Sequence, residues 1–250
     1  MIRIAAAGDV HASEATRDRV ESAFARVEEE ADVVLLAGDL TTHGEPEEGM
    51  VLAEACRALD VPVYAVLGNH DWHANRHHAL VEALANGGIR VLERDHVVCE
   101  AGGLELGIVG VKGFVGGFPG SHLPDFGEPL LREVYAETTR DAEAIARGLR
   151  EIVHCDLRIV LLHYAPVEAT VMGEPAGIHV LLGSDRLATP IAECGADLVL
   201  HGHAHAGSFE GRIGQIPVYN VAVHVTGRDF WIFDLEGARD RSSVEVEGPA

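Results

Sequence analysis

The segment VYAVLGNHD, residues 63–71, shows the pattern that decides the fold of this chain. The apolar run from Val63 to Leu67 is followed at once by a glycine and then by Asn69, His70 and Asp71. An apolar run of this length that ends at glycine is typical of a strand buried on both faces. The segment therefore predicts a buried strand whose end carries polar side chains able to bind a metal ion.

The same pattern occurs at four other places. Each is an apolar run that stops at aspartate or histidine, and three of the four have glycine beside that residue: IAAAGDVH (4–11), VVLLAGD (33–39), IVLLH (159–163) and LVLHGHAH (198–205). We interpret the five segments as buried strands that bring Asp, Asn and His side chains to one rim of a sheet. Oxygen and imidazole nitrogen gathered in this way make a site for one or two divalent metal ions.

The segments between these runs predict an α/β fold. Strands are expected at Ile2–Ala7, Val33–Ala37 and Val63–Leu67, and they alternate with helices at Glu14–Glu30, Pro46–Leu59 and His77–Asn86. Ser13 can cap the first helix. Such alternation predicts parallel strands joined by right-handed crossovers.

After residue 88 the pattern changes. Three short strands joined by turns favour a switch to antiparallel pairing: Ile89–Leu92, His96–Glu100 and Leu104–Val109. The remaining expected elements are the helices Leu130–Val153 and Asp185–Cys194 and the strands Arg158–His163, Asp197–His201, Ile216–Val223, Phe230–Leu235 and Ser243–Val246.

One domain over residues 1–250 is the simplest organisation, because the candidate ligands lie towards both ends of the chain and no long linker separates them. Residues 112–129 are rich in Gly and Pro and have no periodicity. This stretch is either an ordinary loop packed by its own aromatic side chains, Phe114, Phe118 and Phe126, or a lid or pocket wall that selects the substrate.

The composition limits the partners and the compartment. The formal net charge of −21 disfavours binding to a nucleic-acid backbone, but it does not exclude a small anionic substrate once metal ions are bound. The four cysteines are far apart and predict no disulfides. Neither a signal peptide nor a membrane span is indicated, so we expect a cytoplasmic protein. The oligomeric state is left open.

The candidate metal ligands are two aspartates, one asparagine and four histidines: Asp9, His11, Asp39, Asn69, His163, His203 and His205. In extended backbone, Asp9 and His11 would share a face, and so would His203 and His205. A closed structural zinc site takes four ligands and favours cysteine. The larger set and the absence of cysteine favour a catalytic centre.

The order of these motifs resembles that of the calcineurin-like metallophosphoesterase superfamily, from Asp9-x-His11 through Gly38-Asp39, Gly68-Asn69-His70-Asp71 and His163 to Gly202-His203-x-His205. Gly38-Asp39-Leu40-Thr41 and His163-Tyr164-Ala165-Pro166 further resemble the bacterial branch that includes class III cyclic-nucleotide phosphodiesterases. The resemblance implies a four-layer α/β/β/α sandwich of two mixed β-sheets flanked by helices.

The resemblance also implies a role for each matching residue. One metal would be held by Asp9, His11, Asp39 and His205, and the second by Asp39, Asn69, His163 and His203, with Asp39 as the bridge. Hydroxide held between the two ions would attack a small phosphodiester or phosphomonoester. His70 would act as general acid or stabilise the transition state, and Asp71 would orient it by accepting its other ring proton. The mixed nitrogen and oxygen ligands suit Mn, Fe, Zn or Co.

Further histidines lie near these motifs. His73 lies on the loop that carries His70, and His43 lies on the loop after Asp39. Both, together with Asn69, are candidate substrate-binding residues. A structural role is favoured for His201 and His224, and an exposed helical turn for His77 and His78. Two other functions are kept as alternatives: a non-catalytic scaffold with this fold, which the presence of His70 and of every ligand disfavours, and a nuclease, which the acidic composition disfavours.

Overall fold

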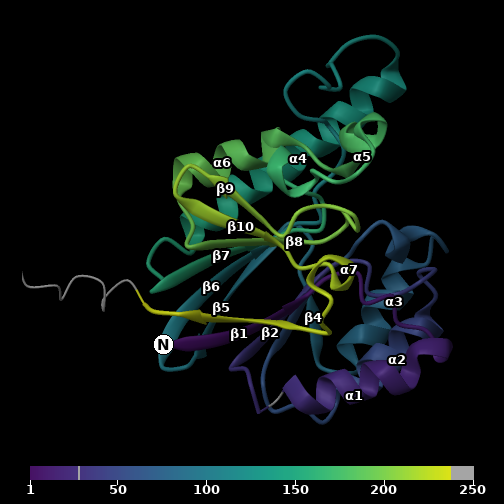
Figure 1. The fold of residues 1–250 in the computed structure, drawn as a ribbon, viewed down its shortest axis with the longest axis vertical. Coiled ribbons are helices and arrows are strands. Elements are labelled where there is room, and N and C mark those ends of the chain that lie inside the picture. The colour runs from purple at the N-terminus through teal and green to yellow at the C-terminus, as the bar shows by residue number, and fades with distance from the viewer. Residues whose placement is uncertain (28, 238–250) are drawn as a thin grey trace, which may run out of the picture.

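The computed structural model describes residues 1–27 and 29–237, and its two β-sheets pack face to face between two layers of helices (Figure 1). This arrangement confirms the expected four-layer α/β/β/α sandwich. The described residues contain no helix that is long and apolar enough to cross a membrane. The expected strand Ser243–Val246 lies outside the described residues.

The first sheet has five strands in the order β11-β1-β2-β3-β4. Their bounds are Trp231–Leu235 for β11, Ile2–Ala7 for β1, Val33–Ala37 for β2, Val63–Val66 for β3 and Ile89–Val91 for β4. β1 to β4 run parallel, whereas β11 is antiparallel to β1, with Phe233 opposite Ile4. β11, the last strand of the described chain, therefore pairs with the edge of β1 that faces away from β2.

The second sheet has six strands in the order β5-β6-β7-β8-β10-β9. Their bounds are Asp95–Ala101 for β5, Leu104–Gly110 for β6, Leu157–Leu161 for β7, Leu198–His201 for β8, Ile216–Asn220 for β10 and Glu210–Ile213 for β9. β6, β7, β8 and β10 are parallel, and the edge strands β5 and β9 are antiparallel to their neighbours.

Helices cover the outer face of each sheet (Figure 1). The first sheet carries α1 (Arg17–Val27), α2 (Pro46–Cys56) and α3 (His77–Ala85), and the second carries α4 (Pro129–Glu151) and α6 (Ala188–Cys194). The shorter elements are α5 (His179–Leu182), α7 (Val223–Thr226) and the 3₁₀ turns Glu14–Thr16, His70–Trp72, Glu168–Thr170, Ala176–Ile178 and Asp185–Leu187.

Three apolar layers fill this sandwich. Between the sheets, Ile4 and Leu35 from the first pack with Ile159 and Leu200 from the second, and all four are fully buried. The outer faces of the same strands pack against the helices. Because the central parallel strands are covered on both faces, nearly every residue in them is apolar, and this is the continuous pattern seen in the sequence.

Some sequence expectations are wrong in detail. The strand at Ile89–Val91 does not begin the antiparallel part, because it pairs in parallel with β3, and the reversal begins with β5 and β6. The edge strand β9 was missed. The first helix begins as the 3₁₀ turn Glu14–Thr16, with Ser13 at its N-cap position.

Residues 112–129 contain no helix or strand before Pro129. Phe118 anchors this loop because its side chain is fully buried against Ala165, Val171, Leu182 and Ala204. In contrast, Phe126 is 76% exposed. Phe114 is half-buried, and its ring centroid lies 5.8 Å from that of Tyr164. Two of the three phenylalanines therefore hold the loop, and its role as a lid or pocket wall stays a prediction.

Candidate metal centre

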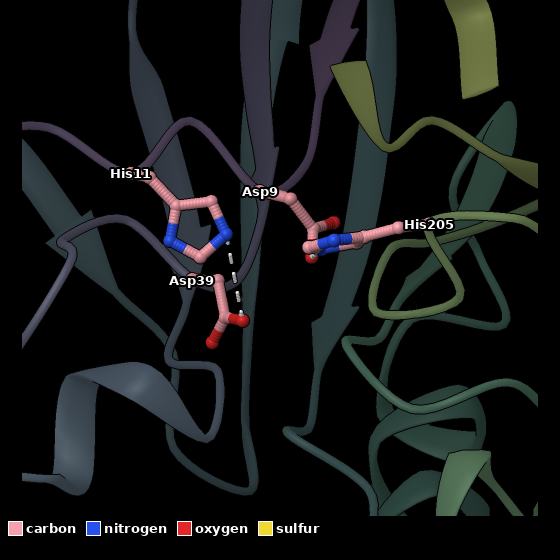
Figure 2. A group of neighbouring side chains, drawn as sticks. All are labelled: Asp9, His11, Asp39 and His205. Atoms are coloured by element: carbon pink, nitrogen blue, oxygen red, sulfur yellow. Dashed lines mark hydrogen bonds and ion pairs between the residues drawn. The ribbon is translucent and has the colours of Figure 1, made fainter. Parts of the chain in front are cut away.

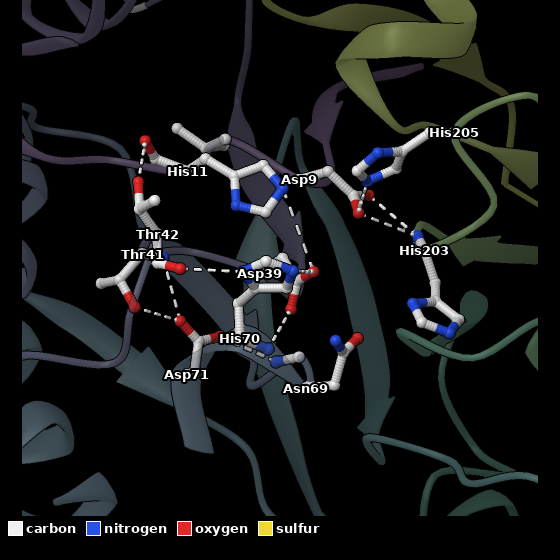
Figure 3. Close-up of polar contacts among 12 residues, drawn as sticks. Asp9, His11, Asp39, Thr41, Thr42, Asn69, His70, Asp71, His203 and His205 are labelled. Carbon is white, nitrogen blue, oxygen red and sulfur yellow. Dashed lines mark hydrogen bonds and ion pairs between the residues drawn. The ribbon is translucent and has the colours of Figure 1, made fainter. Parts of the chain in front are cut away.

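The five predicted segments end at one rim, where the two sheets meet. Asp9 and Asp39 follow β1 and β2 of the first sheet, and His163 and His203 follow β7 and β8 of the second. Hydrogen bonds join the sheets at this rim, since the backbone N–H of His203 donates to Asp9 Oδ2 at 2.9 Å. Figure 3 shows Asp9, Asp39 and His203 converging from loops far apart in the sequence.

Several candidate ligands have left-handed backbone. The φ angles are 59° at Asp9, 48° at His11, 47° at Asp39 and 72° at His203. Side chains other than glycine seldom adopt such angles, and residues that do so cluster at functional sites. The expectation that Asp9 and His11 share a face of an extended segment is wrong, because the backbone turns at both residues. They still belong to the same group of potential ligands.

One group of potential ligands consists of Asp9, His11, Asp39 and His205 (Figure 2), whose ligand atoms lie within 4.8 Å of one another. His205 Nε2 lies 2.7 Å from Asp9 Oδ1, and His11 Nε2 lies 4.0 Å from Asp39 Oδ2. Both carboxylates are almost completely buried. Two carboxylates and two imidazoles are a donor set that suits a divalent transition metal.

A second group shares Asp39 and adds His163 and His203, again with ligand atoms within 4.8 Å of one another. Asn69 belongs beside it, because its Oδ1 lies 2.9 Å from His163 Nε2. His203 Nε2 lies 3.3 Å from the carbonyl oxygen of Leu181, so Nδ1 is the atom left for this group. His203 and His205 therefore fall in different groups, although both follow β8.

The tautomer of His163 tests whether a cation fits. Its Nδ1–H donates to the carbonyl oxygen of Ala37 at 2.9 Å, so Nε2 carries a lone pair. That lone pair faces the carboxylate oxygen Asp39 Oδ1 at 3.4 Å. Two lone pairs held this close repel each other unless a positive charge lies between them. The donor set therefore fits a metal ion.

Burial also sets the protonation states that a metal requires. It lowers the pKa of His203 to about 3 and that of His11 to about 4, and it lowers the pKa of His163 as well. These imidazoles are therefore neutral near pH 7, as ligands must be. Burial raises the pKa of Asp9 to about 6, and the nearby Asp39 carboxylate contributes to the same shift. A bound cation would favour the ionised form of both carboxyl groups.

His70 is held beside the two groups. Its backbone N–H donates to Asp39 Oδ1 at 2.8 Å, and its ring Nδ1–H donates to the carbonyl oxygen of Thr42 at 2.8 Å (Figure 3). Nε2 then points towards the centre and lies 3.9 Å from Asp39 Oδ2. One third of the side chain is exposed. The structure thus presents one free ring nitrogen of His70 at the rim.

The expected contact between Asp71 and His70 is wrong. The Thr42 carbonyl takes the ring proton of His70, and Asp71 has other partners. Its buried carboxylate accepts from the backbone N–H groups of Gly68, Leu40 and Thr41 and from the Thr41 hydroxyl. Asp71 therefore ties the loop after β3 to the loop after β2, and it positions the metal ligands rather than the imidazole.

The candidate substrate-binding histidines lie at the edge of the centre. The His73 ring centroid is 4.4 Å from that of His70. His43 is largely exposed, and its Nδ1 lies 2.8 Å from Glu48 Oε1 at the start of α2. Neither side chain belongs to a metal-binding group. Their roles in substrate binding stay predictions.

The other histidines differ in position. His201 is buried and bonded at both ring nitrogens, to Gly202 O and Thr170 Oγ1, which agrees with the predicted structural role. His224 lies on the helix α7 and not on a strand, and its exposed ring stacks on His205 with centroids 4.1 Å apart. The stacking places the His224 ring beside a candidate ligand, and the structural role favoured for it stays a prediction.

His77 departs from its predicted place on an exposed helical turn. Its ring stacks on Trp72, with centroids 3.9 Å apart and planes 24° apart, and its Nδ1 atom is buried. His78 is exposed, as expected.

With this geometry in place, comparisons with known proteins identify relatives. A family model described as calcineurin-like phosphoesterase matches residues 2–207. Among curated proteins, a probable glycerophosphodiester phosphodiesterase GpdQ from Arcobacter nitrofigilis is 45% identical over 40 residues, which is 16% of this chain and 15% of the relative. The aligned part is thus a small fraction of that relative's length.

Solved structures with the same fold have low sequence identity. The phosphopantetheinyl hydrolase PptH from Mycobacterium tuberculosis has a TM-score of 0.64 and 17% identity over 89% of each chain. A putative 5′-nucleotidase from Staphylococcus aureus has a TM-score of 0.57 and 15% identity, and the match covers 94% of this chain and 53% of that one. At these identities the likeness establishes the shared architecture alone.

Proposed function

This chain belongs to the calcineurin-like phosphoesterase family, and from that premise we propose that it hydrolyses a small phosphodiester or phosphomonoester at a centre for two divalent metal ions. Membership makes it a metal-dependent phosphoesterase. The observation that carries the finer proposal is the pair of ligand groups that share Asp39, with the free nitrogen of His70 beside them.

The residues that would hold the ions follow from the two groups. We assign Asp9, His11, Asp39 and His205 to the first ion and Asp39, Asn69, His163 and His203 to the second. The mixed donors suit Mn, Fe, Zn or Co. When bound, such ions neutralise charge on the phosphoryl oxygens and lower the pKa of water towards about 7, which makes a nucleophile available near neutral pH.

His70 is the group we propose for the leaving oxygen. Because Nδ1–H is held by the Thr42 carbonyl, Nε2 is the ring nitrogen that can carry the transferred proton, and it lies 3.9 Å from Asp39 Oδ2. As the oxygen of water bonds to phosphorus and the ester P–O bond breaks, the Nε2 proton passes to the departing alkoxide. General acid catalysis of this kind contributes about 10²–10⁴-fold.

Two observations favour a particular class of substrate. The net charge of −21 repels a nucleic-acid backbone, and this disfavours a nuclease. The short match to a probable glycerophosphodiester phosphodiesterase favours a diester over a monoester. We therefore expect a small phosphodiester to be the better substrate class.

The test is turnover of two chromogenic esters by Mn²⁺-loaded protein. We expect bis-p-nitrophenyl phosphate to be hydrolysed faster than p-nitrophenyl phosphate, and EDTA to stop both reactions. The His70→Ala variant should bind the same amount of metal and lose most activity. Absence of turnover in metal-loaded wild-type protein would contradict the proposal and would favour a non-catalytic scaffold.

A further inference from the structure

A second cavity lies beside the metal centre, between the loop after β3 and the helix α4. Its volume is about 310 Å³, and its walls include Leu67, Trp72, His77, Arg94, Lys112 and Asp141. This volume is at the lower end of the range for small-molecule pockets. The cavity is distinct from both ligand groups, and nothing in the chemistry derived above uses it.

Two chain segments connect this cavity to the metal centre. Leu67 and Trp72 flank the segment that carries Asn69 and His70. On the opposite wall, the carbonyl oxygen of Lys112 accepts the backbone N–H of His163 at 3.0 Å. The cavity therefore shares its walls with the chain segments that carry or hold members of the second group of ligands.

The polar atoms of the cavity are unusual. Among the residues that the structure describes, two buried side-chain atoms have no hydrogen-bond partner, His77 Nδ1 and Asp141 Oδ2, and both residues line this cavity. Buried polar atoms are nearly always bonded, so such exceptions need an explanation. The Asp141 side chain is only 3% exposed, and its other oxygen, Oδ1, accepts from Arg94 Nε at 2.6 Å. The remaining oxygen of an ionised carboxylate can only accept.

Lys112 supplies a hydrogen-bond donor in the same cavity. The Lys112 ammonium gives one hydrogen bond, to the Gly113 carbonyl at 3.1 Å, and lies 4.5 Å from the centroid of the Phe114 ring. It also lies 5.1 Å from the centroid of the Tyr164 ring, and with three N–H groups an ammonium can give further hydrogen bonds to an anion. The cavity thus offers a donor at Lys112 and an acceptor at Asp141, and His77 Nδ1 is a second acceptor when Nε2 carries the ring proton.

We propose that this cavity binds the organic part of the substrate and recognises an amino group on it, which donates to Asp141 Oδ2 and His77 Nδ1 while the phosphoryl group lies at the metal centre. The inference rests on the proposed function for the position of the phosphoryl group. Asp141 and His77 are then specificity residues that do not touch the reacting atoms. An aminoalkyl ester and an amino-substituted aromatic ester both offer this chemistry.

The experiment uses matched pairs of phosphonates, which the protein cannot hydrolyse. Binding of 2-aminoethylphosphonate and ethylphosphonate, and of 4-aminobenzylphosphonate and benzylphosphonate, is measured by calorimetry on Mn²⁺-loaded protein. We expect the amino member of at least one pair to bind about tenfold more tightly, as loss of a hydrogen bond to a charged group implies. The pair that shows the difference identifies the aminoalkyl or the aromatic class.

Variants test whether Asp141 and His77 cause this difference in affinity. Asp141→Asn places an amide at the acceptor and should reduce the tenfold ratio to near one. Glu133→Gln is the control, because Glu133 pairs with Arg140 and does not line the cavity, and it should keep the ratio in whichever pair shows the difference. If Asp141→Asn does not fold, His77→Phe removes the Nδ1 acceptor, keeps a ring on Trp72 and should lower the ratio.

Equal affinity within both pairs, or a ratio that survives both Asp141→Asn and His77→Phe, would overturn the proposal, and so would failure of every phosphonate to bind. Turnover of the p-nitrophenyl esters separates this failure from that of the proposed function. A protein that hydrolyses these esters but does not discriminate within either pair has the activity without the amino-group pocket.

Discussion

Asp39 Oδ1 lies 3.4 Å from His163 Nε2, although Asp39 follows β2 of one sheet and His163 follows β7 of the other. The second oxygen of the same carboxylate lies 4.0 Å from His11 Nε2. One buried side chain thus faces both groups of ligands and both sheets. The centre depends on the packing of the two sheets as much as on the motifs themselves.

Replacement of Asp39 by Ala should therefore abolish binding of both metals and all phosphoesterase activity. Each group would lose its shared carboxylate, and the neutral imidazoles that remain bind a cation less strongly without it. Metal content after dialysis against Mn²⁺, measured by mass spectrometry, checks the result. Asp18→Ala, at an exposed position on α1, is the control and should keep the metal content and the activity of the wild type. An active Asp39→Ala protein with full metal content would refute the bridging role.

The His70→Ala variant should separate chemistry from metal binding. His70 is in neither ligand group, and its backbone N–H, which holds Asp39, is retained in the variant. We expect kcat to fall about 10²–10⁴-fold with unchanged metal content. His154→Ala, on the exposed side chain paired with Glu105, should leave kcat unchanged. A similar kcat for wild type and His70→Ala would remove His70 from the catalytic step.

Much of the fold could be predicted because the central strands are buried on both faces. Continuous apolar runs such as Val33–Ala37 carry a strong signal, and the polar residues after them mark the rim of the sheet. The edge strand Glu210–Ile213 carries no such signal, because its burial alternates and only half of it is apolar. Pairing direction was also not readable for Ile89–Val91, because parallel pairing to β3 depends on tertiary packing.

The side chains that gather at the rim could be predicted from motifs, but the bonds around them could not. The partner of the His70 ring is a backbone carbonyl, that of Thr42, and any residue type could supply it. The neighbouring carboxylate of Asp71 was the natural candidate in the sequence, yet the loop turns it towards three backbone N–H groups. His224 approaches His205 only because β10 runs beside β8 to the same rim.

Metal binding should stabilise the folded protein. An ion that binds the native state at 100 times its Kd adds about 2.7 kcal/mol to the free energy of unfolding, which corresponds to roughly 5–10 °C in Tm for a chain of this size. Thermal unfolding with Mn²⁺ and with EDTA measures the difference. The Asp39→Ala variant should show no shift. An identical Tm for wild type under both conditions would contradict the metal centre.

Metal affinity should fall as the pH falls through about 6. The pKa of Asp9 is raised to about 6 by burial, and that of His205 is raised by its hydrogen bond with Asp9. The hydrogen-bonded pair of Asp9 and His205 therefore holds at least one proton in mildly acidic metal-free protein, and the metal must displace it. His11 and His203 titrate at about 4 and about 3 and do not compete in this range. We expect Kd for Mn²⁺ to rise at least about tenfold from pH 7.5 to pH 5.5.

Calorimetry in buffers of different ionisation enthalpy tests this expectation by counting the protons released. Release of more protons at pH 5.5 than at pH 7.5 would agree with competition at Asp9 and His205. A Kd that does not change over this range would contradict it.

The glycine before Asn69 should be as necessary as the ligands. A Cβ at Gly68 would lie 2.1 Å from Asp39 Oδ1 and 2.2 Å from the backbone nitrogen of Asp39, so Gly68→Ala must displace the shared carboxylate. We expect loss of metal and activity, together with a destabilisation of about 1–3 kcal/mol from overpacking. Gly177→Ala is the matched control, because a Cβ there meets no atom within 4 Å, and it should change stability by less than about 0.5 kcal/mol. Metal content, kcat and chemical denaturation of both variants test this, and a Gly68→Ala protein with wild-type metal content would show that Asp39 is not held by close packing against this loop.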